Sequence, residues 1–174
     1  MLAVLLSLFV PVKTSAQGDE AVRAIDRMSA DAIRHGRTGS QAFRTLLEDI
    51  AASAVIVHVL TGDTALFGTD GTTRLAGVRA GWRYLRVVLR PQLSADERAA
   101  VLAHELQHVR EIAQYSATTQ AVRNLYDEIG RPVPGTHNAF ETAEASDAGL
   151  KVWRELRAFE RQARREAALH ERQQ

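Results

Sequence analysis

Residues 94–114 read SADERAAVLAHELQHVREIAQ, and this stretch decides how we expect the chain to be arranged. Ser94 and Glu97 have the spacing of a capping box, in which each side chain bonds the backbone N–H of the other. We therefore predict a helix from Ala95 to about Gln114. Its apolar residues give it enough surface to be anchored in a core. They are Val101, Leu102, Leu106, Val109 and Ile112.

The middle of this helix carries the pattern His-Glu-x-x-His at residues 104–108. Residues four apart lie on one face of a helix, so His104 and His108 can bind one cation together. Zinc suits two neutral imidazoles, and a catalytic zinc site keeps one position open for water beside its protein ligands. Glu105 is placed to take a proton from that water as a general base. The sequence therefore predicts Zn²⁺ as cofactor, His104 and His108 as metal ligands, and Glu105 as the catalytic residue.

A third metal ligand must come from another part of the chain, because both histidines come from one helix turn. Glu141 is the predicted ligand, since it follows a Gly- and Pro-rich loop at residues 130–135 and is expected to start a helix. Glu144 lies one turn later and is the alternative. Glu111 shares the face of the two histidines but would have to bend back along its own helix. We expect it to be a supporting or solvated acid rather than a ligand.

The segments around the motif helix alternate between helical and strand patterns. Residues 19–35 repeat apolar side chains at helical spacing, with Gly36 as the expected stop. Residues 82–90 alternate instead, with Leu85, Val87 and Leu89 on one face, which predicts a strand with one buried face. We also predict strands at residues 54–60 and 74–78, and helices at 40–53, 120–129 and from 141 to near the C-terminus.

Composition places the chain among ordinary one-domain globular proteins. It has 174 residues, no cysteine, and 22 basic against 21 acidic residues. The absence of cysteine excludes Cys-ligated zinc, iron–sulfur clusters and thiol nucleophiles. The near-zero net charge offers no strong positive field for nucleic acid or for an anionic membrane, so neither is an expected partner. Nothing in the composition indicates an oligomeric state.

The N-terminus resembles a secretory signal peptide. Residues 2–12 form an apolar run of about signal-peptide length, and small residues at 14–16 precede a polar stretch. The run is too short to span a bilayer as a helix. We predict a signal peptide at 1–16, cleavage near Ala16, and export to the periplasm or the medium without a stable membrane anchor. The mature domain is then 17–174, with the charged segment at about 160–174 expected to fray.

The motif and a downstream glutamate resemble the zincin metallopeptidases of the glutamate-ligand (gluzincin-like) group. The layout as a whole also resembles a type of small exported bacterial protein. This resemblance implies an α+β fold: a small antiparallel sheet packs on the motif helix, additional helices lie at both ends, and a second helix supplies the third ligand. The chain departs from thermolysin-like enzymes in having Phe140 before Glu141 and Ala145 four residues after it. Glu111 and Gln114 exclude the longer metzincin motif.

These observations lead us to expect an exported zinc-dependent hydrolase, most simply a metallopeptidase acting on a peptide or protein substrate. Residues 82–90 are the expected edge strand that would hold an extended substrate by backbone pairing. Tyr115, Tyr126 and His137 are candidates for stabilising an oxyanion. The alternatives are a non-catalytic exported zinc-binding domain and a metal-free helical interaction module.

Overall fold

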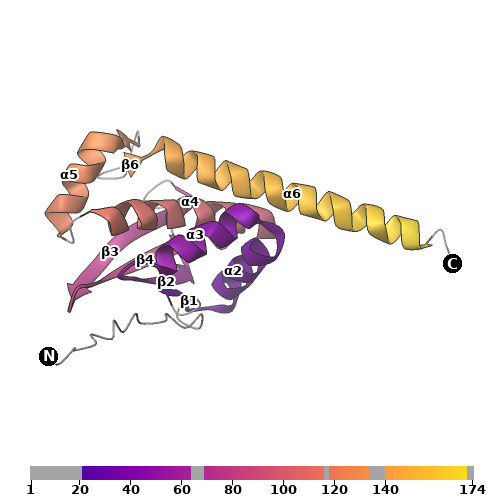
Figure 1. Ribbon diagram of the computed structural model, residues 1–174, viewed down its shortest axis with the longest axis horizontal. Helices are drawn as coiled ribbons and strands as arrows, with labels where there is room; N and C mark the ends of the chain where they lie inside the picture. The colour runs from indigo at the N-terminus through magenta and orange to yellow at the C-terminus, as the bar shows by residue number, and fades with distance from the viewer. Residues whose placement is uncertain (1–20, 64–68, 116–117, 134–139, 172–174) are drawn as a thin grey trace, which may run out of the picture.

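The computed structural model describes residues 21–63, 69–115, 118–133 and 140–171 (Figure 1). The predicted signal peptide at residues 1–16 lies outside these residues, as does His137. No helix in the described part of the chain combines the length and the apolar character needed to cross a bilayer.

The helix α4 (Ala95–Gln114) is the central element, and its bounds are those predicted from the sequence. Glu97 N–H donates to Ser94 Oγ, and Ser94 N–H donates to Glu97 Oε2 at 2.9 Å, which completes the predicted capping box. Figure 1 shows α4 lying between the sheet on one side and α6 (Ala143–Glu171) on the other. This position explains why Leu102, Leu106 and Val109 are fully buried.

The main sheet has four strands in the order β1-β2-β4-β3. Their bounds are Val22–Ala24 for β1, Val55–Thr61 for β2, Gly71–Arg79 for β3 and Trp82–Leu89 for β4. β1, β2 and β4 are parallel, and only β3 runs antiparallel, beside β4. The expectation of an antiparallel sheet is therefore wrong, although the fold is mixed α and β. Two helices connect β1 to β2, and such a crossover returns the chain in the same direction.

The inner face of the sheet carries the predicted strand residues. Leu85, Val87 and Leu89 of β4 are fully buried, as the alternation at residues 82–90 indicated. β3 is longer than the strand predicted at 74–78, and its register with β4 shifts between Leu75 and Gly77. Ala80 and Gly81 join β3 to β4 with φ of 49° and 81°, the backbone of a tight two-residue hairpin turn.

The N-terminal helix begins later than predicted. Within the predicted helix 19–35, residues 22–24 form β1 instead, and α2 spans Arg27–Gly39. Asp26 decides this boundary, because it caps α2 through Ser29 N–H at 2.9 Å and accepts from Thr61 N–H at 2.6 Å. Gly36 does not end the helix. A Cβ at Gly36 would lie 2.6 Å from the Phe43 ring, so this glycine allows α2 to approach α3 (Gln41–Ala51).

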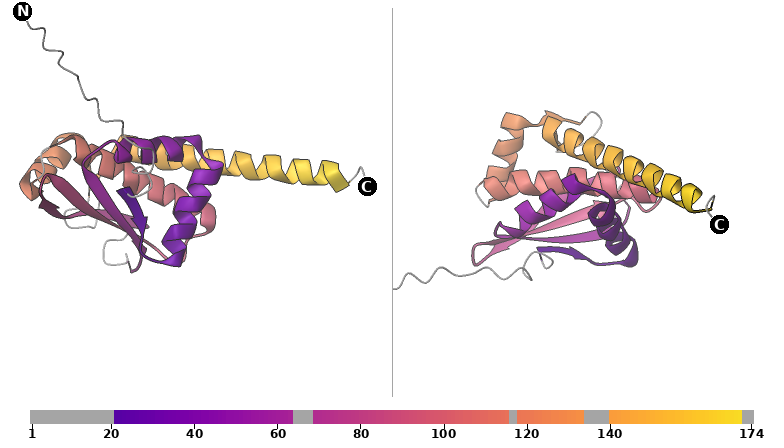
Figure 2. Two further views of the ribbon diagram at one scale, coloured as in Figure 1. Left: turned by 60° about the horizontal axis from the view of Figure 1, so that its bottom comes forward. Right: turned by 45° about the vertical axis from the view of Figure 1, so that its right-hand side comes forward.

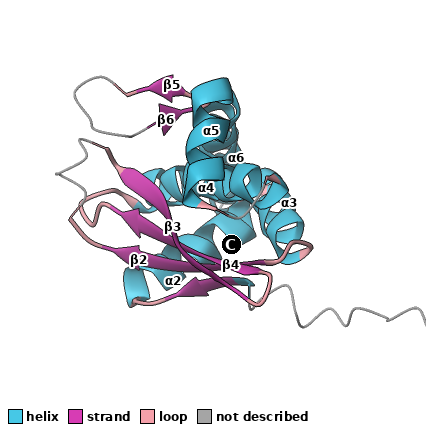
Figure 3. Ribbon diagram, turned by 90° about the vertical axis from the view of Figure 1, so that its left-hand side faces the viewer, coloured by secondary structure: helices cyan, strands magenta, loops and turns pink. Residues whose placement is uncertain are grey.

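The C-terminal third of the chain continues the helical layer. Figure 3 shows α5 (Thr119–Ile129) beside a small two-stranded sheet of β5 (Arg131–Pro132) and β6 (Phe140–Glu141). Glu141 therefore lies in a strand rather than in the first helical turn, and α6 begins two residues later. Figure 2 shows that the second half of α6 projects beyond the rest of the molecule.

A carboxylate of α6 fixes this long helix to the start of α3. Glu155 Oε2 accepts from Ser40 Oγ at 2.7 Å and from Ala42 N–H at 2.9 Å. Partial burial of Glu155 opposes ionisation, but these two hydrogen bonds outweigh it and lower the pKa of the carboxyl. One charged group thus connects residues that are separated by 113 and 115 positions in the sequence.

We predict that Glu155→Ala lowers the free energy of unfolding by about 2 kcal/mol at pH 7, because it removes two hydrogen bonds to a charged acceptor. Because the pKa of Glu155 is lower in the folded protein than in the unfolded chain, its ionised carboxylate stabilises the folded state at pH values above the unfolded pKa near 4.5. This stabilisation is lost as the pH falls through the pKa of Glu155 in the folded protein. The difference from wild type should therefore shrink below pH 4. Urea unfolding at pH 7 and below pH 4 measures this difference. The control is Glu166→Ala, which changes an exposed residue of the same helix.

Candidate functional site

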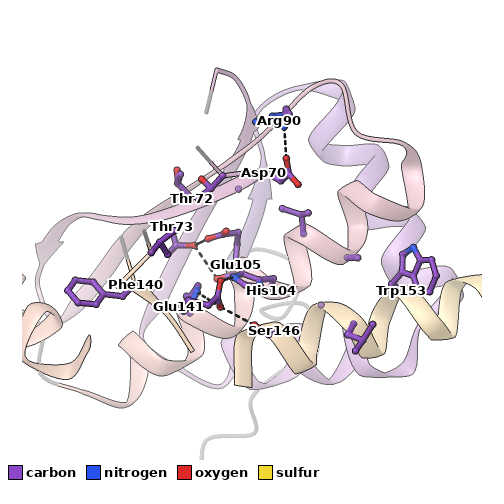
Figure 4. Close-up of a pocket in the computed structure, with 18 of the residues that line it drawn as sticks. Asp70, Thr72, Thr73, Arg90, His104, Glu105, Phe140, Glu141, Ser146 and Trp153 are labelled. Carbon is purple, nitrogen blue, oxygen red and sulfur yellow. Dashed lines mark hydrogen bonds and ion pairs between the residues drawn. The ribbon is translucent and has the colours of Figure 1, made fainter. Parts of the chain in front are cut away.

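An open pocket of about 790 Å³ lies between α4, β3 and α6, and the predicted motif lines it (Figure 4). His104 and His108 face it from successive turns of α4. Their ring centroids are 4.9 Å apart and their planes are nearly perpendicular, at 76°. Glu105 lies beside them in the same pocket. The spacing of the His-Glu-x-x-His motif thus brings His104, Glu105 and His108 together at one pocket.

Glu141 joins the two histidines from β6. Its Oε2 lies 3.3 Å from His104 Nε2, and its Oε1 lies 4.0 Å from His108 Nε2. One ligand atom from each of the three residues falls within 4.8 Å of the other two. Two imidazole nitrogens and one carboxylate oxygen are the donors of an open His₂Glu zinc site, so the residues present fit the predicted metal. Metal binding by this group stays a prediction.

The position of Glu141 follows from its strand and from two local donors. Pairing of Arg131 with Glu141 sets the direction of β6. Thr142 N–H donates to Glu141 Oε1 at 3.0 Å, and the Ser146 hydroxyl donates to the same oxygen at 3.3 Å. Glu144, the alternative ligand, is exposed in the first turn of α6 and is not among the clustered residues.

Glu111 supports His108 from the side away from the pocket. Its Oε2 lies 2.9 Å from His108 Nδ1, while its Oε1 accepts from Thr142 Oγ1 at 2.8 Å and from Gln107 Nε2 at 3.3 Å. Burial would raise the pKa of Glu111, but these hydrogen bonds outweigh it and lower the pKa. A charged Glu111 favours the tautomer with the proton on Nδ1, which leaves the Nε2 lone pair of His108 facing Glu141.

Glu105 is held by β3. Thr73 Oγ1 donates to Glu105 Oε2 at 2.6 Å, a contact drawn in Figure 4. Only 5% of Glu105 is exposed, and this burial raises the pKa of its carboxyl despite the nearby histidines and Thr73. Gly71 allows the close approach, because a Cβ there would lie 2.7 Å from Glu105 Oε1. The sequence analysis missed both Thr73 and Gly71.

His104 and Glu141 contact each other and form an ion pair when His104 is protonated. Burial alone would lower the pKa of His104, but the hydrogen bond with Glu141 and the nearby acidic side chains raise it. Burial would likewise raise the pKa of Glu141, and the hydrogen bond with His104 and the charges of both histidines lower it. The pocket therefore concentrates negative charge next to two imidazoles, as a cation site requires.

The described oxyanion candidates do not line the pocket. Tyr126 is buried behind His108, with its hydroxyl 3.4 Å from Nδ1 and its ring stacked on Phe140. Burial raises the pKa of Tyr126, so the phenol stays protonated. Tyr115 is exposed at the end of α4. Tyr126 thus supports the histidine ring instead of facing a substrate.

The expected edge strand is also corrected. Of residues 82–90, Trp82–Leu89 form β4, which pairs on both sides with β2 and β3 and offers no open edge. β3 is the outer strand beside β4, and its residues 71–74 line the pocket. Alternation of apolar residues identified a strand with a buried face, but it carries no information on the order of strands in a sheet.

Comparisons with models of protein families, with curated proteins and with solved structures found no match to this chain.

We predict that Glu141→Ala weakens zinc binding at least tenfold, because it removes the carboxylate next to both imidazoles, whereas Glu144→Ala leaves the affinity nearly unchanged. Competition with a chelating dye measures both variants against wild type. If Glu144→Ala loses the metal and Glu141→Ala keeps it, the ligand assignment is one turn off.

Proposed function

We propose that the protein is a zinc-dependent hydrolase, with peptide bonds as its substrate. The observation that carries this proposal is the pairing of a buried, oriented Glu105 with three metal-type donors in one open pocket. A zinc ion bound there would supply Lewis-acid polarisation of a carbonyl and activation of water. We further propose that the chain is exported, on the strength of its N-terminal sequence.

Glu105 is the proposed proton carrier. Its carboxylate is buried beside the two histidines, where it can accept a proton from water and later donate it to a leaving amine. Thr73 restricts the orientation of the carboxylate, and His104 lies next to it in the same pocket. A binding site alone has no need of a buried carboxylic acid beside its ligands, and this favours catalysis over a non-catalytic zinc domain.

β3 is the proposed guide for an extended substrate. Its outer edge has no strand partner within the described ranges, and residues 71–74 of this strand line the pocket. An extended peptide can add to such an edge by backbone hydrogen bonds. The same strand bears Thr73, which bonds Glu105. A peptide paired with β3 would therefore pass close to the proposed general base.

We predict that Glu105→Gln keeps about one zinc per molecule but abolishes hydrolysis, because the amide keeps the shape of the side chain and cannot accept the proton. Elemental analysis gives the zinc content, and a mixed peptide library with and without chelator gives the activity. Wild-type protein that holds zinc but cleaves nothing would favour the non-catalytic domain. Activity that survives in Glu105→Gln would assign the base to another residue.

Thr73→Val should lower kcat/KM about tenfold and leave the zinc content unchanged, because the variant frees the carboxylate of Glu105 without touching a ligand. Thr73→Ser restores the hydroxyl and should recover most of the activity. Peptide hydrolysis and zinc analysis on the three proteins measure both effects. Equal activity of the Val variant and wild type would remove Thr73 from the proposed machinery.

A further inference from the structure

A second group of candidate metal ligands lies at the other end of α4, outside the pocket described above. It joins His35 of α2, Asp96 of α4 and Glu160 of α6, and one ligand atom from each lies within 4.8 Å of the other two. Asp96 precedes His104 by eight residues, which is about 12 Å along a helix. The two groups are therefore too far apart to share one ion.

Asp96 is the centre of this second group. Only 7% of the residue is exposed, and its Oδ1 lies 2.7 Å from His35 Nε2. Its other oxygen lies 3.6 Å from Arg157 Nη1, which is longer than a hydrogen bond. A buried carboxylate normally has both oxygens well satisfied. The contact of Asp96 Oδ2 with Arg157 is therefore an ion pair without a hydrogen bond, and a closer cation could replace it.

Arg157 balances this charge only loosely. Its Nη1 lies 3.6 Å from Asp96 Oδ2 and also 3.6 Å from Glu160 Oε2, and its side chain is about half exposed. Its guanidinium carbon is 5.5 Å from the centre of the Trp153 ring, so Arg157 also makes a cation–π contact. Arg157 can therefore leave the two carboxylates without losing every partner.

We propose that His35, Asp96 and Glu160 form a second metal site, for a divalent transition ion such as Zn²⁺. Two carboxylates balance the charge of one divalent cation when Arg157, and Arg164 at 3.7 Å from Glu160 Oε2, turn away from them. The imidazole nitrogen favours zinc and its neighbours over Ca²⁺ or Mg²⁺, which prefer oxygen ligands alone. Water completes the coordination, because His35 and Glu160 are partly exposed. The proposal does not depend on the function of the first pocket.

The role of this second site is structural. Its ligands come from three helices, so an ion there would tie α2, α4 and α6 together. Glu160 is followed by residues that are exposed as far as Glu171, the part of α6 that projects from the molecule (Figure 2). The ion would thus hold α6 at the point where it leaves the core. Because the unfolded chain lacks this arrangement, binding would stabilise the folded state.

Calorimetric titration of metal-free, full-length protein with zinc chloride tests the proposal. Wild type should bind zinc in two steps, a tight one and a weaker one. His35→Ala should lose the weaker step and keep the tight one, and Glu160→Gln, a mild change at the surface, should weaken the second step roughly tenfold. His170→Ala removes an exposed histidine of the same helix outside the group and should keep both steps.

Thermal unfolding supplies the second readout. After one equivalent of zinc, further zinc should raise Tm in wild type and in His170→Ala but not in His35→Ala. A single wild-type step that His35→Ala keeps, or identical behaviour of Glu160→Gln and His170→Ala, would show that the group is an ion-pair network without a metal. A single wild-type step that His35→Ala removes would contradict the first zinc centre and leave the second standing.

Discussion

The need to satisfy buried polar groups on α4 is the constraint on which the rest of the structure depends. This helix lies between the sheet and α6, yet it carries Glu105, Gln107, His108 and Glu111 in buried positions. An unpartnered polar group in such a place costs about 1–3 kcal/mol, and more when it is charged. The layers on both sides must therefore supply donors. β3 supplies Thr73 to Glu105, and Thr142, the residue before α6, bonds Glu111.

Thr142 shows how this constraint connects the fold to the site. Its hydroxyl accepts from Ala145 N–H at 3.1 Å, which caps α6, and donates to Glu111 at 2.8 Å. The residue before it is Glu141, whose carboxylate faces both histidines. Thr142 thus caps α6 and gives a hydrogen bond to a buried carboxylate of α4. Its neighbour Glu141 brings a carboxylate to the two histidines of the pocket. The start of α6 and the position of Glu141 therefore cannot change independently.

The sequence predicts some parts of this arrangement well, and the reasons are physical. α4, β2 and β4 have long periodic patterns or a capping box, so the sequence indicates both their type and their approximate bounds. β1 spans only three residues, and its apolar positions also suit a helix. Strand direction depends on how the connections cross the sheet, and no single strand contains that information. The pattern of a strand shows which side chains are buried but not which strand lies at the edge.

The same limit applies within the site. The spacing of His104 and His108 identifies one helix face, and a carboxylate after a loop is a reasonable third donor. Thr73 and Thr142 give no such signal, because threonine in a strand or at a helix start is ordinary. Their roles arise only when distant segments meet. Residues that touch the predicted metal could be chosen by their chemistry, whereas those that orient its ligands could be found only from the fold.

Two glycines set the distances that make these contacts possible. On one side of α4, Gly71 lets β3 come close enough for Thr73 to reach Glu105. On the other side, a Cβ at Gly149 would lie 3.1 Å from Ala100 O and 3.2 Å from His104 Cβ, so Gly149 lets α6 approach α4. A side chain at Gly71 would push β3 away from α4, and a side chain at Gly149 would push α6 away from α4. The pocket therefore depends on the close approach of β3 and α6 to opposite sides of α4. These two short distances between elements keep its polar side chains in contact.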